Sequence, residues 1–218
     1  MRMRRKPWAR PELEVCEFFL KEPTQNLNKW NHYFKNNAPI YLELGCGKGT
    51  FIAELANKNK QINFIGIDLK SDMLGLAKRN IEKIYHQNNQ EINNVVLLAY
   101  DIERIGDVIG EHDKIDRIYI NFCNPWPKPR HKKKRLTYTR QLENYKLFLK
   151  KGGEIYFKTD DEGLFQDSLK YFQETGFKII FQTFDLHQEQ REDNVITEHE
   201  KMFSEQGIKI KALIAQWL

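Results

Sequence analysis

The sequence has no long apolar run. Its hydrophobic stretches fall well short of the ~18 residues that a transmembrane helix needs. Charged residues occupy the start of the chain, where a secretory signal peptide needs an apolar segment. The chain also contains no internal repeat and no low-complexity tract. We therefore expect a soluble, cytoplasmic protein that makes no use of a membrane.

Cysteine is scarce. Cys16, Cys46 and Cys123 are odd in number and do not have the spacing of metal ligands. We therefore expect neither a disulfide nor a metal site, as is usual in the reducing cytosol.

Excess positive charge is absent from most of the chain and is concentrated in two segments. Five basic residues lie within the first ten positions and six more lie within residues 128–135, without an acid in either segment. Without these eleven, 24 basic residues face 30 acidic ones, so the body of the protein is acidic. This asymmetry indicates a polyanionic partner.

The length of 218 residues fits one domain of ordinary size with a short extension. Residues 1–38 combine basic residues, prolines and aromatic residues, and we interpret them as a basic N-terminal arm. Residues 39–218 form the single domain that is expected to bury the core.

An apolar run from Ile40 ends in three glycines, Gly45, Gly47 and Gly49, and then resumes with helical spacing. This order predicts a strand, a tight turn and a helix. Glycine accepts positive φ and lets a ligand approach the backbone, so the turn is suited to a nucleotide-like molecule. The spacing differs from that of dinucleotide binders, and alone it fits a simple strand-to-helix connection equally well.

A second apolar run, residues 62–67, ends at Asp68. In a Rossmann-like βαβ unit an acid at this point accepts hydrogen bonds from the ribose hydroxyls of the ligand. Asp68 also fits the cap of the following helix. We favour the ligand role because Ser71 is itself a good N-cap.

Strands and helices alternate along the rest of the chain. We expect strands at residues 95–99, 115–121, 154–158 and 177–181, with a last one within 208–217. A helix from Thr137 should stop at Gly152-Gly153. The alternation predicts an α/β fold, a Rossmann-like doubly wound and mostly parallel sheet with an antiparallel C-terminal edge strand.

The glycine turn, with Glu43 before it and Asp68 after it, resembles that of the class I methyltransferases that use S-adenosylmethionine. Three prolines from Pro125 to Pro129 stiffen the segment after the strand at 115–121. A rigid loop at the carboxyl end of a central strand is where open α/β sheets place their chemistry.

Over nearly its whole length the sequence resembles the bacterial tRNA (guanine-N7)-methyltransferases. The resemblance is carried by Lys6-Pro7-Trp8-Ala9, the turn at 43–49, Asn124-Pro125-Trp126-Pro127-Lys128, the basic run at 130–136 and Thr197-x-x-Glu200. It implies an enzyme, a monomer or homodimer, that transfers a methyl group from S-adenosylmethionine to N7 of a variable-loop guanine in tRNA.

The resemblance also implies roles for individual residues. The cofactor would be held by Glu43, Gly45, Gly47, Gly49, Asp68, Asp101 and Asn124, with Asn124 also at the catalytic centre. The substrate guanine would meet Lys128, Asp160, Thr197 and Glu200. The RNA would lie on Arg130, His131, Lys132, Lys133, Lys134 and Arg135.

This chain departs from the family at two of these positions. The family usually has Asp where this chain has Asn124, and Glu where it has Asp68. The second change keeps a carboxylate. The first removes a charge from the catalytic position, so a mechanism that needs an anion there has no support in this sequence.

Several of these residues also fit plainer structural roles. Thr197 and Glu200 fit a capping box, alone or together with a substrate contact. Asp160 fits the cap of the helix that follows it, and Asp101 fits a simple loop acid. The basic run fits a solvated loop less well, because clustered cations repel one another without a counter-charge.

Two other classes of function are consistent with parts of the pattern. An amino methyltransferase of the adenine-N6 type, acting on RNA, has an Asn-Pro-Pro-aromatic loop that Asn124-Pro125 resembles. Trp126 and the basic run argue against this class. A catalytically silent RNA-binding subunit is the other alternative, and the intact glycines and Asp68 argue against it.

Overall fold

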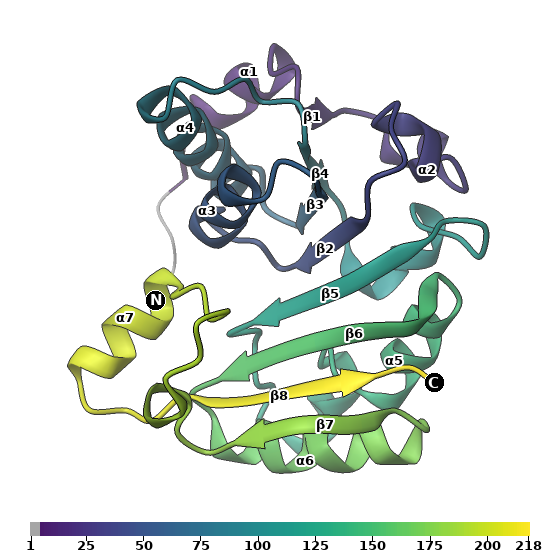
Figure 1. The fold of residues 1–218 in the computed structure, drawn as a ribbon, viewed down its shortest axis with the longest axis vertical. Coiled ribbons are helices and arrows are strands. Elements are labelled where there is room, and N and C mark those ends of the chain that lie inside the picture. The colour runs from purple at the N-terminus through teal and green to yellow at the C-terminus, as the bar shows by residue number, and fades with distance from the viewer. Residues whose placement is uncertain (1–4) are drawn as a thin grey trace.

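A computed structural model describes residues 5–218, so Arg2 and Arg4 of the basic start lie outside the described residues. Eight strands form one sheet with helices on both faces (Figure 1). The strands are β1 (Phe19–Leu20), β2 (Ile40–Leu44), β3 (Asn63–Asp68), β4 (Val95–Ala99), β5 (Ile115–Asn121), β6 (Leu149–Thr159), β7 (Lys178–Thr183) and β8 (Lys211–Gln216). The α-helices are α1 (Ala9–Glu14), α2 (Trp30–Tyr33), α3 (Thr50–Lys58), α4 (Ser71–Gln87), α5 (Thr139–Lys146), α6 (Glu162–Glu174) and α7 (Glu198–Glu205). No helix in this part of the chain is long and apolar enough to span a bilayer.

The sheet has the order β1-β4-β3-β2-β5-β6-β8-β7, which confirms the predicted doubly wound fold. All pairs from β1 to β6 are parallel, and β8 runs antiparallel to both of its neighbours. The antiparallel C-terminal strand was expected at the edge, but it lies one place inside and β7 takes the edge. Residues 212–215 of β8 are all buried, whereas β7 alternates between exposed and partly buried residues over 178–182. A continuously apolar strand needs cover on both faces, which an inner position provides.

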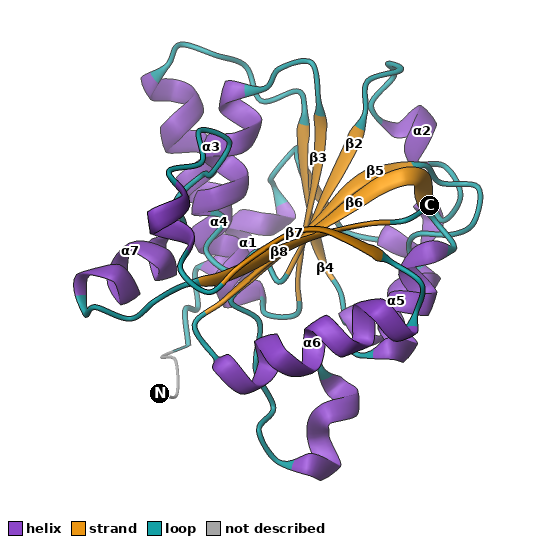
Figure 2. Ribbon diagram, turned by 60° about the horizontal axis from the view of Figure 1, so that its bottom comes forward, coloured by secondary structure: helices purple, strands orange, loops and turns teal. Residues whose placement is uncertain are grey.

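Helices cover both faces of the sheet, and the hydrophobic cluster on one face is larger than that on the other (Figure 2). The helices α1, α3 and α4 lie on one face and bury a cluster that includes Ile52, Leu74 and Ile81. The helices α5 and α6 lie on the other face, over a larger cluster that includes Leu142 and Phe165. Both clusters fix the carboxyl ends of β2, β3 and β5, where the candidate site lies.

The segment before β2 packs closely on the rest of the chain. Trp30 is fully buried, and its indole Nε1–H donates to the carbonyl of Val108 at 2.7 Å. The helix α1 lies against α4 where Gly75 meets Ala9, and a Cβ on Gly75 would lie 2.6 Å from that of Ala9. Strand β1 extends the sheet by pairing with β4. The predicted arm is therefore integrated with the domain over residues 5–38.

The predicted boundary between the helix from Thr137 and the strand after it was wrong. The helix expected to run from Thr137 to the glycine pair ends at Lys146, and β6 begins at Leu149. Leu149 of β6 pairs with Ile115 of β5, and the next pair along the strands is Glu154 with Arg117. The register therefore shifts between these pairs, and the glycines lie in a bulge within β6. The positive φ of Gly152, +79°, serves this bulge rather than a helix end.

Candidate cofactor and RNA site

The glycine turn joins β2 to α3 and lies over the end of β3. Its three glycines have positive φ angles of 80°, 54° and 67°. The N–H groups of Gly45 and Cys46 both donate to the carbonyl of Ile67 at 2.9 Å, which fixes the turn against the sheet. A Cβ on Gly49 would lie 2.6 Å from that of Ala77, so only glycine lets α3 begin this close to α4. The predicted strand, turn and helix are confirmed.

Asp68 ends β3 and fastens the glycine turn to it. Its Oδ2 accepts from the Gly47 N–H at 3.0 Å, and its Oδ1 accepts from the Lys70 N–H at 2.9 Å. Each oxygen keeps a free lone pair for a ligand hydroxyl. Ser71 was expected to cap α4, but it is the first helical residue and Lys70 takes the cap position without a side-chain bond.

Glu43 lies one residue before the end of β2 and is only 4% exposed. Its Oε1 accepts from Asn121 Nδ2 at 3.1 Å. Its Oε2 has no hydrogen-bond partner among the described residues, and neither does Asn121 Oδ1. Burial raises the pKa of Glu43 to about 8, because its charged form loses solvation.

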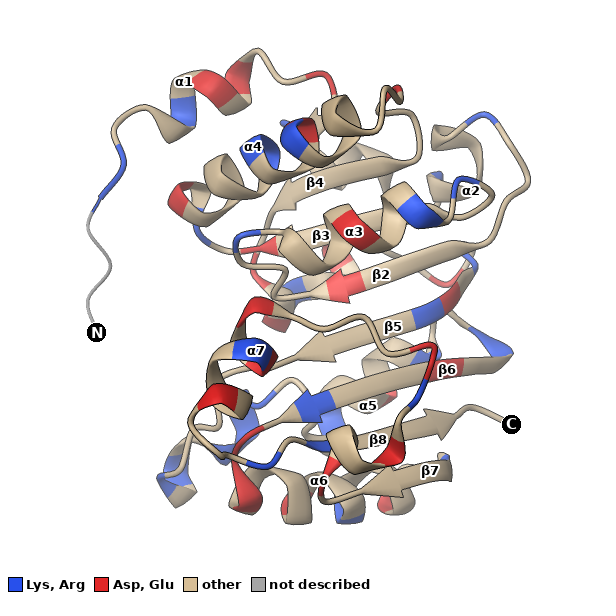
Figure 3. Cartoon of the chain, turned by 60° about the vertical axis from the view of Figure 1, so that its left-hand side comes forward, with Lys and Arg blue, Asp and Glu red and all other residues tan. Residues whose placement is uncertain are grey.

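These elements surround one cleft. Its walls are Glu43, Gly45, Cys46, Gly47, Lys48, Thr50, Phe51, Met73, Asn121, Phe122, Thr197, Glu198 and His199. The helix α7 lies beyond the carboxyl ends of β5 and β6 (Figure 3). An ion pair of 2.7 Å joins Lys48 of the glycine turn to Glu198 of α7, and His199 stacks on Phe122. The cleft thus has the glycine turn on one side and α7 on the other.

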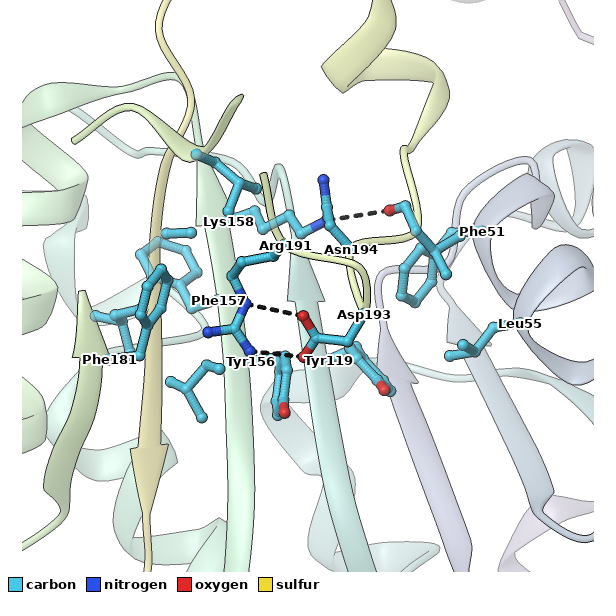
Figure 4. Close-up of a pocket in the computed structure, with 15 residues that line it drawn as sticks. Phe51, Leu55, Tyr119, Tyr156, Phe157, Lys158, Phe181, Arg191, Asp193 and Asn194 are labelled. Atoms are coloured by element: carbon cyan, nitrogen blue, oxygen red, sulfur yellow. Dashed lines mark hydrogen bonds and ion pairs between the residues drawn. The ribbon is translucent and has the colours of Figure 1, made fainter. Parts of the chain in front are cut away.

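A second hollow adjoins this cleft on the face of the sheet (Figure 4). Phe51 lines both hollows, and Tyr119 and Tyr156 form the floor of the second. Arg191 pairs with Asp193 across it, with contacts of 2.8 and 2.6 Å. Its free volume of about 30 Å³ holds no more than a few water molecules.

The structure does not bring Asn124 to the cleft walls. Asn124 is exposed, and its Oδ1 accepts from the Trp126 N–H at 3.0 Å. Trp126 and Phe122 both have positive φ, which is uncommon for aromatic residues and typical of loops under functional constraint. Asn121, three residues earlier, lies beside Glu43 instead. Sequence reasoning missed it, although a polar residue ending an apolar central strand was a usable signal.

Asp101 follows β4 and is exposed. Its Oδ1 accepts from the Glu103 N–H at 3.0 Å and caps the short 3-10 helix Ile102–Asp107. It lies outside the cleft walls described above. Its role toward the cofactor stays a prediction.

Asp160 does not cap α6. The cap is Asp161, whose Oδ1 accepts from the Leu164 N–H at 2.6 Å. The Asp160 carboxylate has no hydrogen bond or ion pair within residues 5–218, while its carbonyl accepts from Lys211 at 2.9 Å. The carboxylate at the end of β6 is therefore available to a ligand.

Thr197 and Glu200 form the capping box of α7. Thr197 Oγ1 accepts from the Glu200 N–H at 3.0 Å, and Glu200 Oε2 accepts in return from the Thr197 N–H at 3.4 Å. Glu200 is fully buried and also contacts Lys158 at 3.1 Å and Asn194 at 2.7 Å. Burial lowers the pKa of Lys158. Thr197 and Glu200 therefore cap α7, and a substrate contact by either residue stays a prediction.

The basic run forms the 3-10 helix Pro129–Lys134 on the surface. Arg130, Lys133 and Lys134 are exposed and make no ion pair within the described part of the chain. Lys128, just before this helix, is exposed in the same way. Lys132 pairs with Asp167 at 2.6 Å and remains partly exposed.

The expectation that Arg135 lies on the RNA was wrong. Its side chain is 3% exposed and pairs with Asp167 at 2.6 Å. Its Nε–H donates to the carbonyl of Pro125 at 2.7 Å. Arg135 therefore holds the proline loop through the Pro125 carbonyl. A basic residue at the end of a charged run can turn inward when an acid of a neighbouring helix pairs with it.

The second basic segment borders the start of α4. Arg5, Lys6, Arg10 and Lys70 line one shallow hollow there. The Lys6 N–H donates to Asp72 at 2.9 Å, which attaches the N-terminal segment to α4 close to Asp68.

The fold is that of the class I methyltransferases. A 16S rRNA methyltransferase superposes with a TM-score of 0.60 at 11% identity, covering 82% of this chain and 87% of that one. An antibiotic-related methyltransferase superposes with a TM-score of 0.57 at 18% identity, covering 89% of each chain. At these identities the likeness concerns the fold alone.

Sequence comparison gives the family. Residues 37–213 match the family described as a putative methyltransferase. A tRNA (guanine-N(7)-)-methyltransferase of Clostridium beijerinckii is 62% identical over 215 residues, covering 99% of this chain and 98% of that protein. A protein of the same name from Clostridium perfringens is 59% identical over 219 residues and covers both chains completely. The chain belongs to the bacterial tRNA (guanine-N7)-methyltransferase family.

Proposed function

We propose that this protein transfers the methyl group of S-adenosylmethionine to N7 of a variable-loop guanine in tRNA, in the cytoplasm. The observation that carries the proposal is the glycine turn, with Glu43 before it and Asp68 hydrogen-bonded to its Gly47, in a chain whose relatives bear the name of this activity. The names of these relatives support N7 methylation over the adenine-N6 alternative, and the retained cleft argues against a silent subunit.

The residues of the cleft fit the cofactor. Glu43 Oε2 is a buried acceptor without a partner and suits the ammonium group of the methionine moiety. Asp68 keeps free lone pairs for the ribose hydroxyls, and the glycines leave the backbone open to close approach. When bound, the cofactor supplies a methyl group on a positively charged sulfur.

Methylation of guanine N7 requires no proton transfer by the protein. N7 is an sp2 nitrogen with an in-plane lone pair, so methylation removes no proton and needs no general base. The site must align N7 with the methyl carbon and sulfur and stabilise positive charge as it moves to the purine. Asn124, although it lies outside the cleft walls, is the residue that we expect to offer a dipole for this purpose, with its orientation fixed by the hydrogen bond to Trp126.

Recognition of the base falls to Asp160. A guanine with N7 toward the methyl group leaves N1–H and the N2 amine free, and one carboxylate can accept from both. The Asp160 carboxylate is available for this because Asp161 serves as the helix cap. The exposed cations Lys128, Arg130, Lys133 and Lys134 hold the phosphate backbone.

The test is incubation with unmodified tRNA and labelled S-adenosylmethionine, followed by nucleoside mass spectrometry. The expected product is 7-methylguanosine, and reduction followed by aniline should cleave the tRNA at one position in the variable loop. The product N6-methyladenosine would refute the N7 assignment in favour of the amino methyltransferase. The absence of any product with tRNA that binds would support the silent subunit.

A further inference from the structure

Glu43 and Asn121 form a pair at the ends of two neighbouring strands. Glu43 on β2 is in register with Tyr119 on β5, so Asn121 lies two residues further along the same face of the sheet. Asn121 Nδ2 donates to Glu43 Oε1 at 3.1 Å. Both side chains line the cleft together with Gly45 and Gly47.

The pair carries two oxygen atoms without a hydrogen-bond partner. Glu43 Oε2 and Asn121 Oδ1 are buried and have no hydrogen-bond partner within residues 5–218. Buried polar atoms in folded proteins nearly always have a partner, so two adjacent exceptions on a cleft wall indicate a missing partner. An ammonium group offers three donors and no acceptor, which suits these two oxygens once Glu43 is a carboxylate.

We propose that Asn121 is a positioning residue, which holds Glu43 through Nδ2 and accepts a hydrogen bond from the cofactor's α-ammonium through Oδ1, and that Glu43 releases a proton to solvent when this ammonium binds. This inference rests on the proposed use of S-adenosylmethionine. The proton leaves the carboxylic acid of Glu43 for the buffer, and no other bond is made or broken.

The surroundings of Glu43 favour its neutral form in the free protein. Burial and, to a smaller extent, the carboxylate of Asp68 raise its pKa to about 8, while Asn121, Lys158 and the backbone N–H of Ile52 act in the opposite direction. Lys48, Cys46, Glu198 and His199 also face the cleft from the glycine turn and from α7. A cation in contact with Glu43 reverses this balance, because an opposite charge within a few ångströms favours the carboxylate.

Calorimetry of cofactor binding measures the proton directly. Titrations at pH 6.5 in two buffers of different ionisation enthalpy give the number of protons released per site. We expect about one, because nearly all Glu43 is protonated at this pH and the α-ammonium, with a pKa of roughly 7.7–8.0, is already charged. The observed affinity should rise about tenfold between pH 6 and pH 7. Binding without proton release would overturn this inference and leave the methyltransferase proposal standing, whereas absence of binding would overturn both.

Variants test whether Asn121 positions Glu43 and the cofactor or only supports the structure. Asn121→Leu should weaken binding roughly 10- to 150-fold, the range for hydrogen bonds to a charged group. In the free protein, carbon-13 NMR of the Glu43 carboxyl should show a higher titration midpoint than in the wild type, since the donor that lowers the pKa of Glu43 is lost. Asn88→Leu, an exposed asparagine at the end of α4, should change neither quantity.

Glu43→Gln provides the complementary test. This variant keeps the size of the side chain but cannot ionise, so any binding that remains should release no proton. Proton release that persists in Glu43→Gln, or a wild-type Glu43 that titrates below pH 5 in the free protein, would refute the proposal. The wild-type measurements need no variant to fold.

Discussion

Replacement of Asp68 by alanine should lower both the affinity for the cofactor and the stability of the protein, each through the loss of different hydrogen bonds. The substitution removes acceptors for the ribose hydroxyls, and losing hydrogen bonds to a charged group costs about 1.5–3 kcal/mol, or about 10- to 150-fold in affinity. It also removes the partners of the Gly47 and Lys70 N–H groups. Two such bonds contribute roughly 1–3 kcal/mol, which lowers the melting temperature by about 2–12 °C for a chain of this size.

Calorimetry with S-adenosylmethionine, well below the melting temperature, measures the first effect, and a thermal melt without cofactor measures the second. Asp113→Ala is the matched control, because the fully buried Asp113 also accepts backbone N–H groups, from Asn28, Trp30 and Gly110, at the amino end of the sheet. It should lower the melting temperature and leave the affinity unchanged. If Asp68→Ala binds the cofactor as tightly as the wild type, Asp68 only braces the turn and the cofactor site described above is wrong.

The remaining predictions concern the RNA and the chemistry. Substituting Lys133 and Lys134 together by alanine should weaken tRNA binding and reduce its salt slope by about 1–2 without changing cofactor affinity, whereas Arg135→Ala should mainly lower the melting temperature. Asp160→Asn should reduce activity and the preference for guanine while leaving the melting temperature unchanged, and an early-melting variant with normal activity would contradict the assignment. Asn124→Asp should change the methylation rate by less than about tenfold, or ~1.4 kcal/mol of barrier, and a loss of activity with this variant would show that the amide is required.

Elements with a strong apolar pattern were predictable from the sequence. The strands at 95–99 and 115–121 have the predicted limits, because the first is a continuous apolar run and the second is rich in isoleucine and ends at the polar Asn121. The boundary between α5 and β6 was not predictable in the same way. Leu149 suits the apolar face of a helix and the interior of a strand equally well, and only its pairing with Ile115 decides between them.

In the candidate site, too, some residues could be predicted from the sequence and others could not. The glycines and Asp68 were identified because local geometry demands their residue types and spacing. The choice between Asp160 and Asp161 as helix cap, and between Asn121 and Asn124 as neighbour of Glu43, depends on side-chain directions that the sequence does not encode locally. Arg135 was misjudged because its partner Asp167 lies on α6, 32 residues away in the chain.

The position of β8 between β6 and β7 has a consequence for biosynthesis. In the described sheet β7 pairs with β8 alone, so it has no strand to join until residues 211–216 have been made. A nascent chain that stops before this point exposes the open edge of β6 and an unpaired β7, both of which invite pairing with other chains. Premature termination near residue 210 should therefore yield an aggregating polypeptide rather than a slightly shortened protein, although every residue of the glycine turn and of the basic run is already in place.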